Sequence, residues 1–264
     1  MVQAPVTASR SSETPAARPL AGRHALITGA SRGIGAAVAR ELARLGAELT
    51  LIARDHAALT RTAEPLGARI HAADVTSADD IRRLTTGIRP VDILVNNAGG
   101  AESAPFARTD AALWQRMLDL NLTSAYRVTH ALVPAMAKAG WGRIINVAST
   151  AGLKGYAYVS AYTAAKHGVV GLTRALALEF ARSGVTVNAV CPGYTDTPML
   201  DGAIDAIAAK TAKSKDEARA ALAVANPMGR LVTPEEVAAA VGWLCLPESG
   251  SITGQAIAIA GGEL

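Results

Sequence analysis

A tyrosine and a lysine near the middle of the chain have the spacing that proton transfer needs. Tyr162 and Lys166 are four residues apart in Tyr-Thr-Ala-Ala-Lys, so on a helix they project from one face, a turn apart. A free tyrosine titrates near ~10, but an adjacent ammonium ion favours the phenolate and lowers the pKa. The pair could therefore exchange a proton with a carbonyl or alcohol oxygen. Taken alone, the same spacing also fits a half-buried ring beside a snorkelling lysine.

A glycine-rich turn near the start of the chain could bind a phosphate. Residues 24–28 are expected to form a short buried strand, and residues 36–45 a helix. Between them lies Gly29-Ala-Ser-Arg-Gly33-Ile-Gly35, with the spacing G-x-x-x-G-x-G. A strand, a glycine-rich turn and a helix present backbone N–H groups and the positive end of the helix to a phosphate. A plain tight turn is the alternative.

Together these motifs resemble those of the classical branch of the short-chain dehydrogenase/reductase family, over about residues 20–264. The glycine turn is similar to the cofactor motif, and Asp74-Val75 to the acidic position that contacts adenine. Asn96-Asn97-Ala98-Gly99 is similar to the segment that ends the fourth strand, and Pro192-Gly193 with Thr197 to the segment that flanks the nicotinamide. These matches occur in the order that the family pattern requires.

The resemblance implies reversible hydride transfer between a nicotinamide and a ketone or secondary alcohol. Tyr162 would protonate the carbonyl oxygen, and Ser149, thirteen residues earlier, would hydrogen-bond the same oxygen. Lys166 would lower the pKa of Tyr162 and hold the ribose hydroxyls, and Asn121 would anchor a water that links Lys166 to solvent. The expected cofactor-binding residues are Gly29, Ser31, Arg32, Gly33, Ile34, Gly35, Arg54, Asp74, Val75, Asn97, Ala98, Gly99, Tyr162, Lys166, Pro192, Gly193, Thr195 and Thr197. The expected substrate-binding residues are Thr150, Leu153, Tyr156, Tyr194, Met199 and Leu200.

The end of the second predicted strand favours NADP(H) over NAD(H). NAD-preferring relatives carry an acid there, whereas this chain has Ala53 followed by Arg54, with Arg32 in the glycine turn. A guanidinium pairs with a 2′-phosphate in a bidentate manner, and a carboxylate would repel it. Asp55 keeps NAD(H) open, because a register shift of two would place an acid at this position.

The alternation of apolar segments predicts an α/β fold with one domain. Strands are expected at residues 25–28, 49–53, 69–73, 93–96, 144–147, 185–190 and 256–260, mostly separated by helices. This pattern predicts a Rossmann-type, doubly wound parallel sheet of about seven strands with helices on both faces. Residues 1–19 are expected to be a disordered tail and residues 20–264 the catalytic domain, with a helical substrate lid at about 195–227. The motif residues follow predicted strands, where such sheets bind ligands.

The predicted substrate walls are mostly apolar, which favours a 3-oxoacyl thioester or a related hydrophobic ketone. Carrier-protein substrates are less favoured, because Lys138-Ala-Gly-Trp-Gly-Arg143 retains only part of the basic patch that docks the carrier in ketoacyl reductases of the family. A carbonyl reductase or alcohol dehydrogenase for small cyclic or aryl ketones is the alternative. A non-catalytic nucleotide sensor fits less well, since Tyr162 and Lys166 are both present.

Composition and residue spacing argue against several other functions. A net charge of +4 with scattered basic residues does not predict nucleic-acid binding, and five histidines without ligand spacing do not predict a metal site. No stretch approaches the ~20 apolar residues of a membrane span. Two cysteines in apolar contexts, Cys191 and Cys245, favour a reducing, cytoplasmic compartment.

The helix expected from Tyr162 to about Ala181 is apolar nearly all round. The resemblance implies that this helix pairs across an interface in a homotetramer, with a homodimer as the alternative.

Overall fold

A computed structural model of the chain describes residues 18–211 and 214–264. Its sheet has seven parallel strands in the order β3-β2-β1-β4-β5-β6-β7. A parallel sheet in which the strand order reverses beside the first strand has its ligand crevice at the carboxyl ends of the strands. The strands are β1 (His24–Thr28), β2 (Glu48–Ala53), β3 (Arg69–Ala72), β4 (Ile93–Asn96), β5 (Gly142–Val147), β6 (Val185–Pro192) and β7 (Ala256–Ile259).

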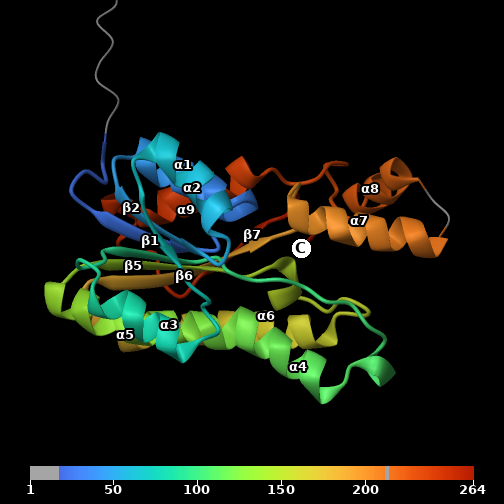
Figure 1. Cartoon of the computed structure of the whole chain (residues 1–264), viewed down its shortest axis with the longest axis horizontal. Helices are drawn as coiled ribbons and strands as arrows, with labels where there is room; N and C mark the ends of the chain where they lie inside the picture. Colours follow the sequence, from blue (N-terminus) through green and yellow to red (C-terminus); the bar gives the residue numbers. More distant parts are fainter. Residues whose placement is uncertain (1–17, 212–213) are drawn as a thin grey trace, which may run out of the picture.

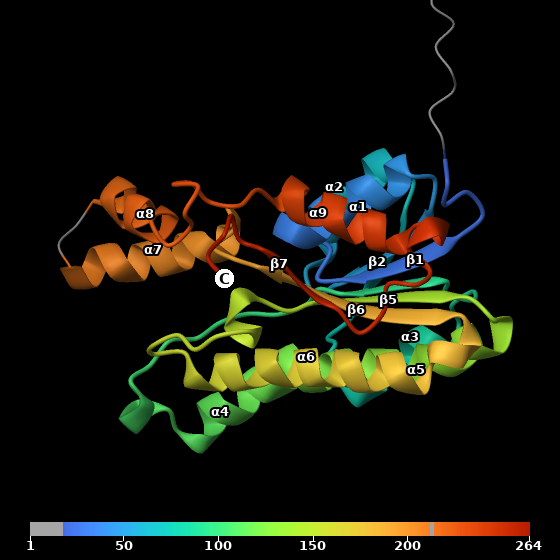
Figure 2. The ribbon, with the colours of Figure 1, turned by 180° about the vertical axis from the view of Figure 1, so that it is seen from behind.

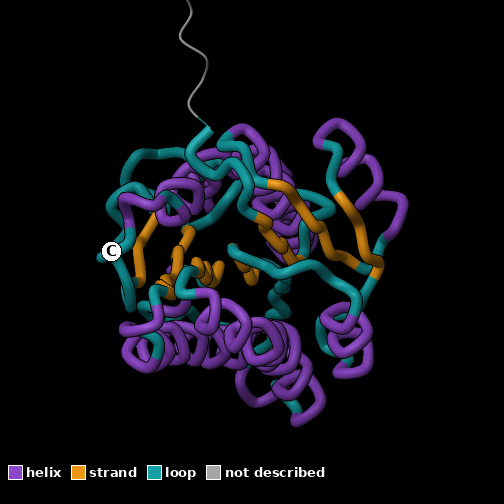
Figure 3. Tube along the Cα trace, turned by 90° about the vertical axis from the view of Figure 1, so that its left-hand side faces the viewer, coloured by secondary structure: helices purple, strands orange, loops and turns teal. Residues whose placement is uncertain are grey.

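Helices cover both faces of this sheet. Figures 1 and 2 show α1, α2 and α9 on one side and α3, α4, α5 and α6 on the other, and Figure 3 shows the strands between these two layers. The two remaining helices, α7 and α8, project beyond the end of the sheet (Figure 1). The helices are α1 (Gly33–Arg44), α2 (His56–Ala63), α3 (Ala78–Thr86), α4 (Ala111–Leu118), α5 (Ser124–Ala139), α6 (Ser160–Glu179), α7 (Pro198–Thr211), α8 (Lys215–Ala223) and α9 (Pro234–Cys245).

The central strands are apolar on both faces because each face is covered by helices. Neighbouring residues of a strand point to opposite faces, so Ile27 packs in the core with α1 and α9 while Leu26 packs in the core with α3 and α5. Leu94 and Val95 of β4 divide in the same way. Each fully buried side chain of this size contributes about 1.5–3 kcal/mol, so the sheet is held from both sides.

The predicted doubly wound sheet is confirmed, and every predicted strand is present within two residues of its expected bounds. The expected helix at 36–45 begins three residues earlier, at Gly33 in the glycine turn. Most of the predicted tail, residues 1–17, lies outside the described residues, while Leu20 is buried in the core. Among the described residues, no helix combines the length and apolar character needed to cross a membrane.

Two helices occupy the region expected to be a substrate lid. The predicted start of α8 is present as a capping box, in which Ser214 and Glu217 each bond the other's backbone N–H. Arg219 of α8 pairs with Asp196, just before α7 begins, and Lys215 pairs with Asp205 of α7 at 2.7 Å. These ion pairs connect α8 to α7 and to the loop after β6.

Candidate active site

One large cleft runs along the carboxyl ends of the strands. Its volume is about 1240 Å³, and its walls come from the loops after β1 to β6 and from α6, α7 and α8. Of the predicted site residues, all but Gly35 and Leu153 line it. The chain therefore folds segments more than 190 residues apart, from Gly29 to Leu222, into one concave surface.

The glycine turn forms the end of this cleft that could cradle a phosphate. Gly29 and Gly33 have φ of +65° and +55°, in the left-handed region that favours glycine. A Cβ on Gly29 would lie 2.8 Å from the Cα of Ala98, and α1 begins at Gly33 with its N-terminus at the cleft. Gly35 does not line the cleft: a Cβ on it would lie 2.4 Å from the carbonyl oxygen of Gly29, so this glycine lets α1 pack close to the turn after β1.

The asparagine segment after β4 joins the glycine turn to the centre of the sheet. The Thr28 hydroxyl accepts from the backbone N–H groups of Asn97 and Ala98, each at 3.0 Å. The Asn97 side chain donates to the carbonyls of Thr28 and Gly29, and Asn96 donates to Asn146 on β5. These bonds hold the two loops that form the middle of the cleft.

Asn121 lies in a π-helical turn, Asp119–Thr123, between α4 and α5. Its side-chain amide donates to the carbonyls of Gly100 and Met117, and its oxygen accepts from the Gly100 N–H. π-Helical turns inside helices occur frequently at functional sites. A Cβ on Gly99 would lie 2.8 Å from the Asn121 oxygen and 3.5 Å from the Lys166 ammonium nitrogen, so this glycine leaves the space beside both groups open.

Lys166 is a buried cation facing the cleft. Its side chain donates to the Val147 carbonyl oxygen at 2.8 Å, and its nitrogen is 5.7 Å from the centre of the Tyr162 ring. Burial lowers the pKa of Lys166 to about 8, because desolvation disfavours the charged form. An ammonium has three N–H donors, so the donors not used by Val147 suit the hydroxyls of a ribose.

Tyr162 and Ser149 are brought together as expected, but the pKa of Tyr162 differs from the expectation. Burial raises the pKa of Tyr162 above its ordinary value, and the hydrogen bond with Ser149 lowers it by a smaller amount. The expected lowering by Lys166 does not prevail, because the largest influence on the pKa of Tyr162 is its removal from water. Tyr162 is therefore held as a phenol, the form that can donate a proton.

Ser149 lies two residues after β5 and starts a short 3₁₀ turn, Thr150–Gly152. Its hydroxyl accepts from the Ala151 N–H at 3.1 Å, which orients the side chain at the cleft. The nearby Cys191 thiol is buried, and burial raises its pKa to about 11, so it stays protonated and unreactive at neutral pH.

Beside the glycine turn, β2 ends at Ala53 and Arg54 follows it. Arg54 and Arg32 both line the cleft there. The carboxylate of Asp55 accepts from the Ala58 N–H at 3.0 Å and caps the start of α2. The alternative register, with an acid at the end of β2, is therefore not the one that forms. Asp74 accepts from the backbone and the side chain of Thr76, which shapes the turn after β3.

The substrate end of the cleft contains five of the six predicted residues and an unexpected loop. Thr150, Tyr156, Tyr194, Met199 and Leu200 line it, whereas Leu153 packs in a separate core cluster with Val169 and Val170. The loop after β4 forms a further wall through Gly100, Ala101, Ser103, Ala104 and Pro105. Because this loop follows a predicted strand, the sequence could have indicated it as part of the cleft wall.

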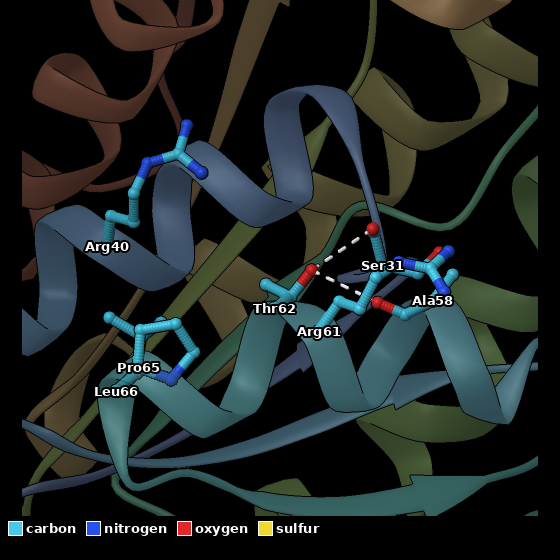
Figure 4. A pocket seen from close by; sticks show the side chains of 7 residues that line it. All are labelled: Ser31, Arg40, Ala58, Arg61, Thr62, Pro65 and Leu66. Carbon is cyan, nitrogen blue, oxygen red and sulfur yellow. Dashed lines mark hydrogen bonds between the residues drawn. The ribbon is translucent and has the colours of Figure 1, made fainter.

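A second, smaller hollow of about 280 Å³ lies between α1 and α2 (Figure 4). Ser31 and Ala58 line both hollows, and Thr62 donates to the carbonyls of these two residues at 3.1 and 3.3 Å. Arg40, at its rim, pairs with Glu235 at 3.0 Å. This hollow thus adjoins the arginine-lined end of the main cleft.

Comparisons with known proteins agree with this geometry. Residues 23–208 match the family model for short chain dehydrogenases. The chain is 39% identical to the 3-oxoacyl-[acyl-carrier-protein] reductase FabG of Vibrio cholerae, over 92% of this chain and 98% of the relative. It is 36% identical to the acetoacetyl-CoA reductase of Allochromatium vinosum, over 91% and 98%. A crystal structure of an actinorhodin polyketide ketoreductase variant with NADPH superposes with a TM-score of 0.89 at 39% identity, over 94% of this chain and 98% of that one.

Proposed function

The chain belongs to the short chain dehydrogenase family and is an NAD(P)H-dependent oxidoreductase, and from that premise we propose that it reduces a 3-oxoacyl thioester or a related hydrophobic ketone. One observation carries the proposal: Ser149, Tyr162 and Lys166 line the same cleft, and the buried Lys166 donates to the Val147 carbonyl at the end of β5. Ketoacyl substrates are supported by the names of similar proteins and by the apolar side chains of Met199, Leu200 and Leu222 at the substrate end.

In the proposed mechanism, Tyr162 is the general acid for reduction. Its phenol donates a proton to the substrate oxygen, and the Ser149 hydroxyl donates a hydrogen bond to the same oxygen. The Lys166 ammonium favours the phenolate that remains, and Asn121 holds the Gly99–Gly100 backbone open beside that lysine. The nicotinamide cofactor supplies the hydride when it is bound. In the reverse direction, Tyr162 takes the proton from an alcohol.

The residues present fit a dinucleotide. The glycine turn and the N-terminus of α1 suit the pyrophosphate, and Lys166 suits the nicotinamide ribose. We favour NADP(H), because Arg54 and Arg32 line the end of the cleft where a 2′-phosphate would lie and Asp55 is engaged in capping α2. The likeness to a ketoreductase crystallised with NADPH supports this choice.

Three further features are part of the proposal. We expect α7 and α8 to close over the substrate end, since both contribute residues to the cleft wall. We expect a homotetramer, with a homodimer as the alternative. We expect a reducing, cytoplasmic compartment, which the two buried free cysteines support.

The decisive experiment measures oxidation of NADPH, and separately of NADH, against acetoacetyl-CoA and a panel of aryl and cyclic ketones. We expect NADPH-linked turnover of the thioester, reduced ~10²–10⁴-fold in Tyr162→Phe, because general acid catalysis contributes about that much. Tyr126→Phe, on the exposed surface of α5, is the matched control and should retain wild-type turnover.

Turnover confined to the plain ketones would replace the proposal with a carbonyl reductase or alcohol dehydrogenase. Thioester turnover that persists in Tyr162→Phe would show that another group supplies the proton.

A further inference from the structure

A buried carboxylate near the end of the chain reaches the wall of the substrate cleft. The Glu263 side chain is only 4% exposed, and its Oε1 oxygen is 3.0 Å from the Lys154 ammonium nitrogen. The same oxygen accepts a hydrogen bond from the Tyr156 hydroxyl. A Cβ on Gly193 would lie 3.0 Å from the other carboxylate oxygen, so Glu263 lies directly behind the segment after β6. Figures 1 and 2 show the chain end beside α7, between the two helical layers.

The hydrogen bonds around Tyr156 have only one consistent direction. A phenol has one proton, and Tyr156 donates it to Glu263. The Thr150 hydroxyl lies 2.7 Å from the Tyr156 oxygen, so Thr150 must be the donor in that contact. With its proton engaged, Thr150 can meet a cleft ligand only as an acceptor. The carboxylate therefore sets the polarity of the residue that follows Ser149.

The same contacts fix the tyrosine ring. Tyr156 meets the ring of Tyr194 edge to face, with the ring centres 6.3 Å apart, and the Lys154 ammonium nitrogen is 5.1 Å from the Tyr156 ring centre. Tyr156, Tyr194 and Thr150 all line the cleft. A ring held at its hydroxyl, its edge and its face presents a single, rigid apolar surface to a substrate.

We propose that Glu263 is a positioning residue that determines substrate binding through Tyr156 and Thr150. The inference rests on the proposed function, because it concerns the substrate wall of the same site. Glu263 does not line the cleft itself, so its influence passes through the Tyr156 hydroxyl. Glu263 thereby contributes to substrate specificity without contacting the substrate.

A double-mutant cycle tests the proposal in the full-length protein, with acetoacetyl-CoA as the ketone and NADPH as the reductant. Glu263→Ala and Tyr156→Phe should each raise KM for the ketone about tenfold while kcat changes less than about threefold, because each breaks the charge-assisted contact between Tyr156 and Glu263. The double variant should resemble either single variant, since both changes break the same chain of contacts. Glu263→Gln keeps an acceptor oxygen and should recover most of the wild-type KM.

Two readouts separate positioning from a general structural role. The Kd of NADPH, measured by fluorescence titration, should stay within about twofold of wild type in every variant. Glu248→Ala, an exposed acid in the turn after α9, is the matched control and should leave KM unchanged.

A KM that is unaffected in folded Glu263→Ala, or effects of the two single changes that multiply in the double variant, would overturn the inference. Tyr156→Phe leaves Glu263 in place, so a wild-type KM in that variant overturns it even where Glu263→Ala does not fold. A wild-type enzyme that reduces no ketone would overturn the proposed function, and this inference with it.

Discussion

At the scale of single residues, burial decides the protonation chemistry of the site. Lys166 is 4% exposed, and desolvation brings its pKa to about 8, close to the pH at which enzymes operate. The pKa of Tyr162 is raised by the same cause, so this residue remains a phenol over the neutral range. Of the two groups, the lysine is therefore the one that titrates within the working range.

This difference predicts a pH dependence. The lysine is charged below its pKa, and its charge favours the phenolate left when Tyr162 gives up its proton. The kcat/KM for ketone reduction should therefore fall as pH rises through about 8. Lys166→Met should show no such fall and a lower plateau, by ~10²-fold. A pH profile of kcat/KM checks this, with the exposed Lys138→Met as control; an unchanged fall in Lys166→Met would assign the titration to another group.

At the scale of elements, the junction between β2 and α2 places two neighbouring residues at the cleft, and one of them also caps the helix. The strand ends at Ala53 and the helix begins at His56, which leaves Arg54 and Asp55 in the connection. Asp55 accepts from the Ala58 N–H, so its carboxylate stabilises the first turn of α2. Arg54 and Asp55 both line the cleft, and the exposed Arg54 guanidinium can meet a phosphate there.

Substitutions at these two positions should separate cofactor choice from helix stability. Arg54→Ala should lower kcat/KM with NADPH by ~10-fold or more and leave the value with NADH nearly unchanged, because it removes a charge-assisted contact. Asp55→Ala should lower the free energy of unfolding by about 1 kcal/mol without reversing the preference, and Asp55→Asn should retain the cap. Steady-state kinetics with both cofactors and urea unfolding measure the two effects.

Arg61→Ala provides the matched control, because Arg61 lies on α2 at the second hollow and is not part of the main cleft wall (Figure 4). A wild-type preference for NADH, or an equal loss in Arg61→Ala, would contradict the assignment of Arg54.

At the scale of the whole molecule, the surface of α6 points to assembly. The sequence predicts a helix that is apolar nearly all round, and in the single chain only one face of α6 is buried, through residues such as Val169 and Val170. Leu178, near its end, is 83% exposed. An exposed apolar side chain on a helix that is already buried on its other side suits contact with a second copy of the chain.

We therefore expect a homotetramer in solution at micromolar concentration, measured by light scattering. Leu178→Glu should give a smaller assembly, because a charge in an apolar interface is costly to bury. Val224→Glu is the matched control, since Val224 is also highly exposed but follows the last residue of α8. A monomeric wild-type mass would refute the assembly, and a tetrameric Leu178→Glu would place the interface elsewhere.

The sequence by itself determined the sheet and the middle of the site. Buried strands and the helices between them have strong, distinct apolar patterns, and a parallel doubly wound sheet brings the residues after its strands to one edge. Gly29, Asp74, Ser149 and Pro192 therefore meet at one cleft, as their positions just after predicted strands indicated. Local apolar patterns were enough to predict this part of the site, because a parallel doubly wound sheet brings the residues that follow its strands to the same edge.

Only the tertiary structure decided the parts that depend on packing between distant segments. Leu153 packs against a core cluster and Gly35 against the turn after β1, and spacing alone cannot distinguish either position from one that lines a cleft. The direction of the Tyr162 pKa depends on how much water the folded chain excludes. The contact of Tyr156 with Glu263 joins residues 107 positions apart and follows no periodic pattern, so it exists only because the fold places the chain end behind the cleft wall.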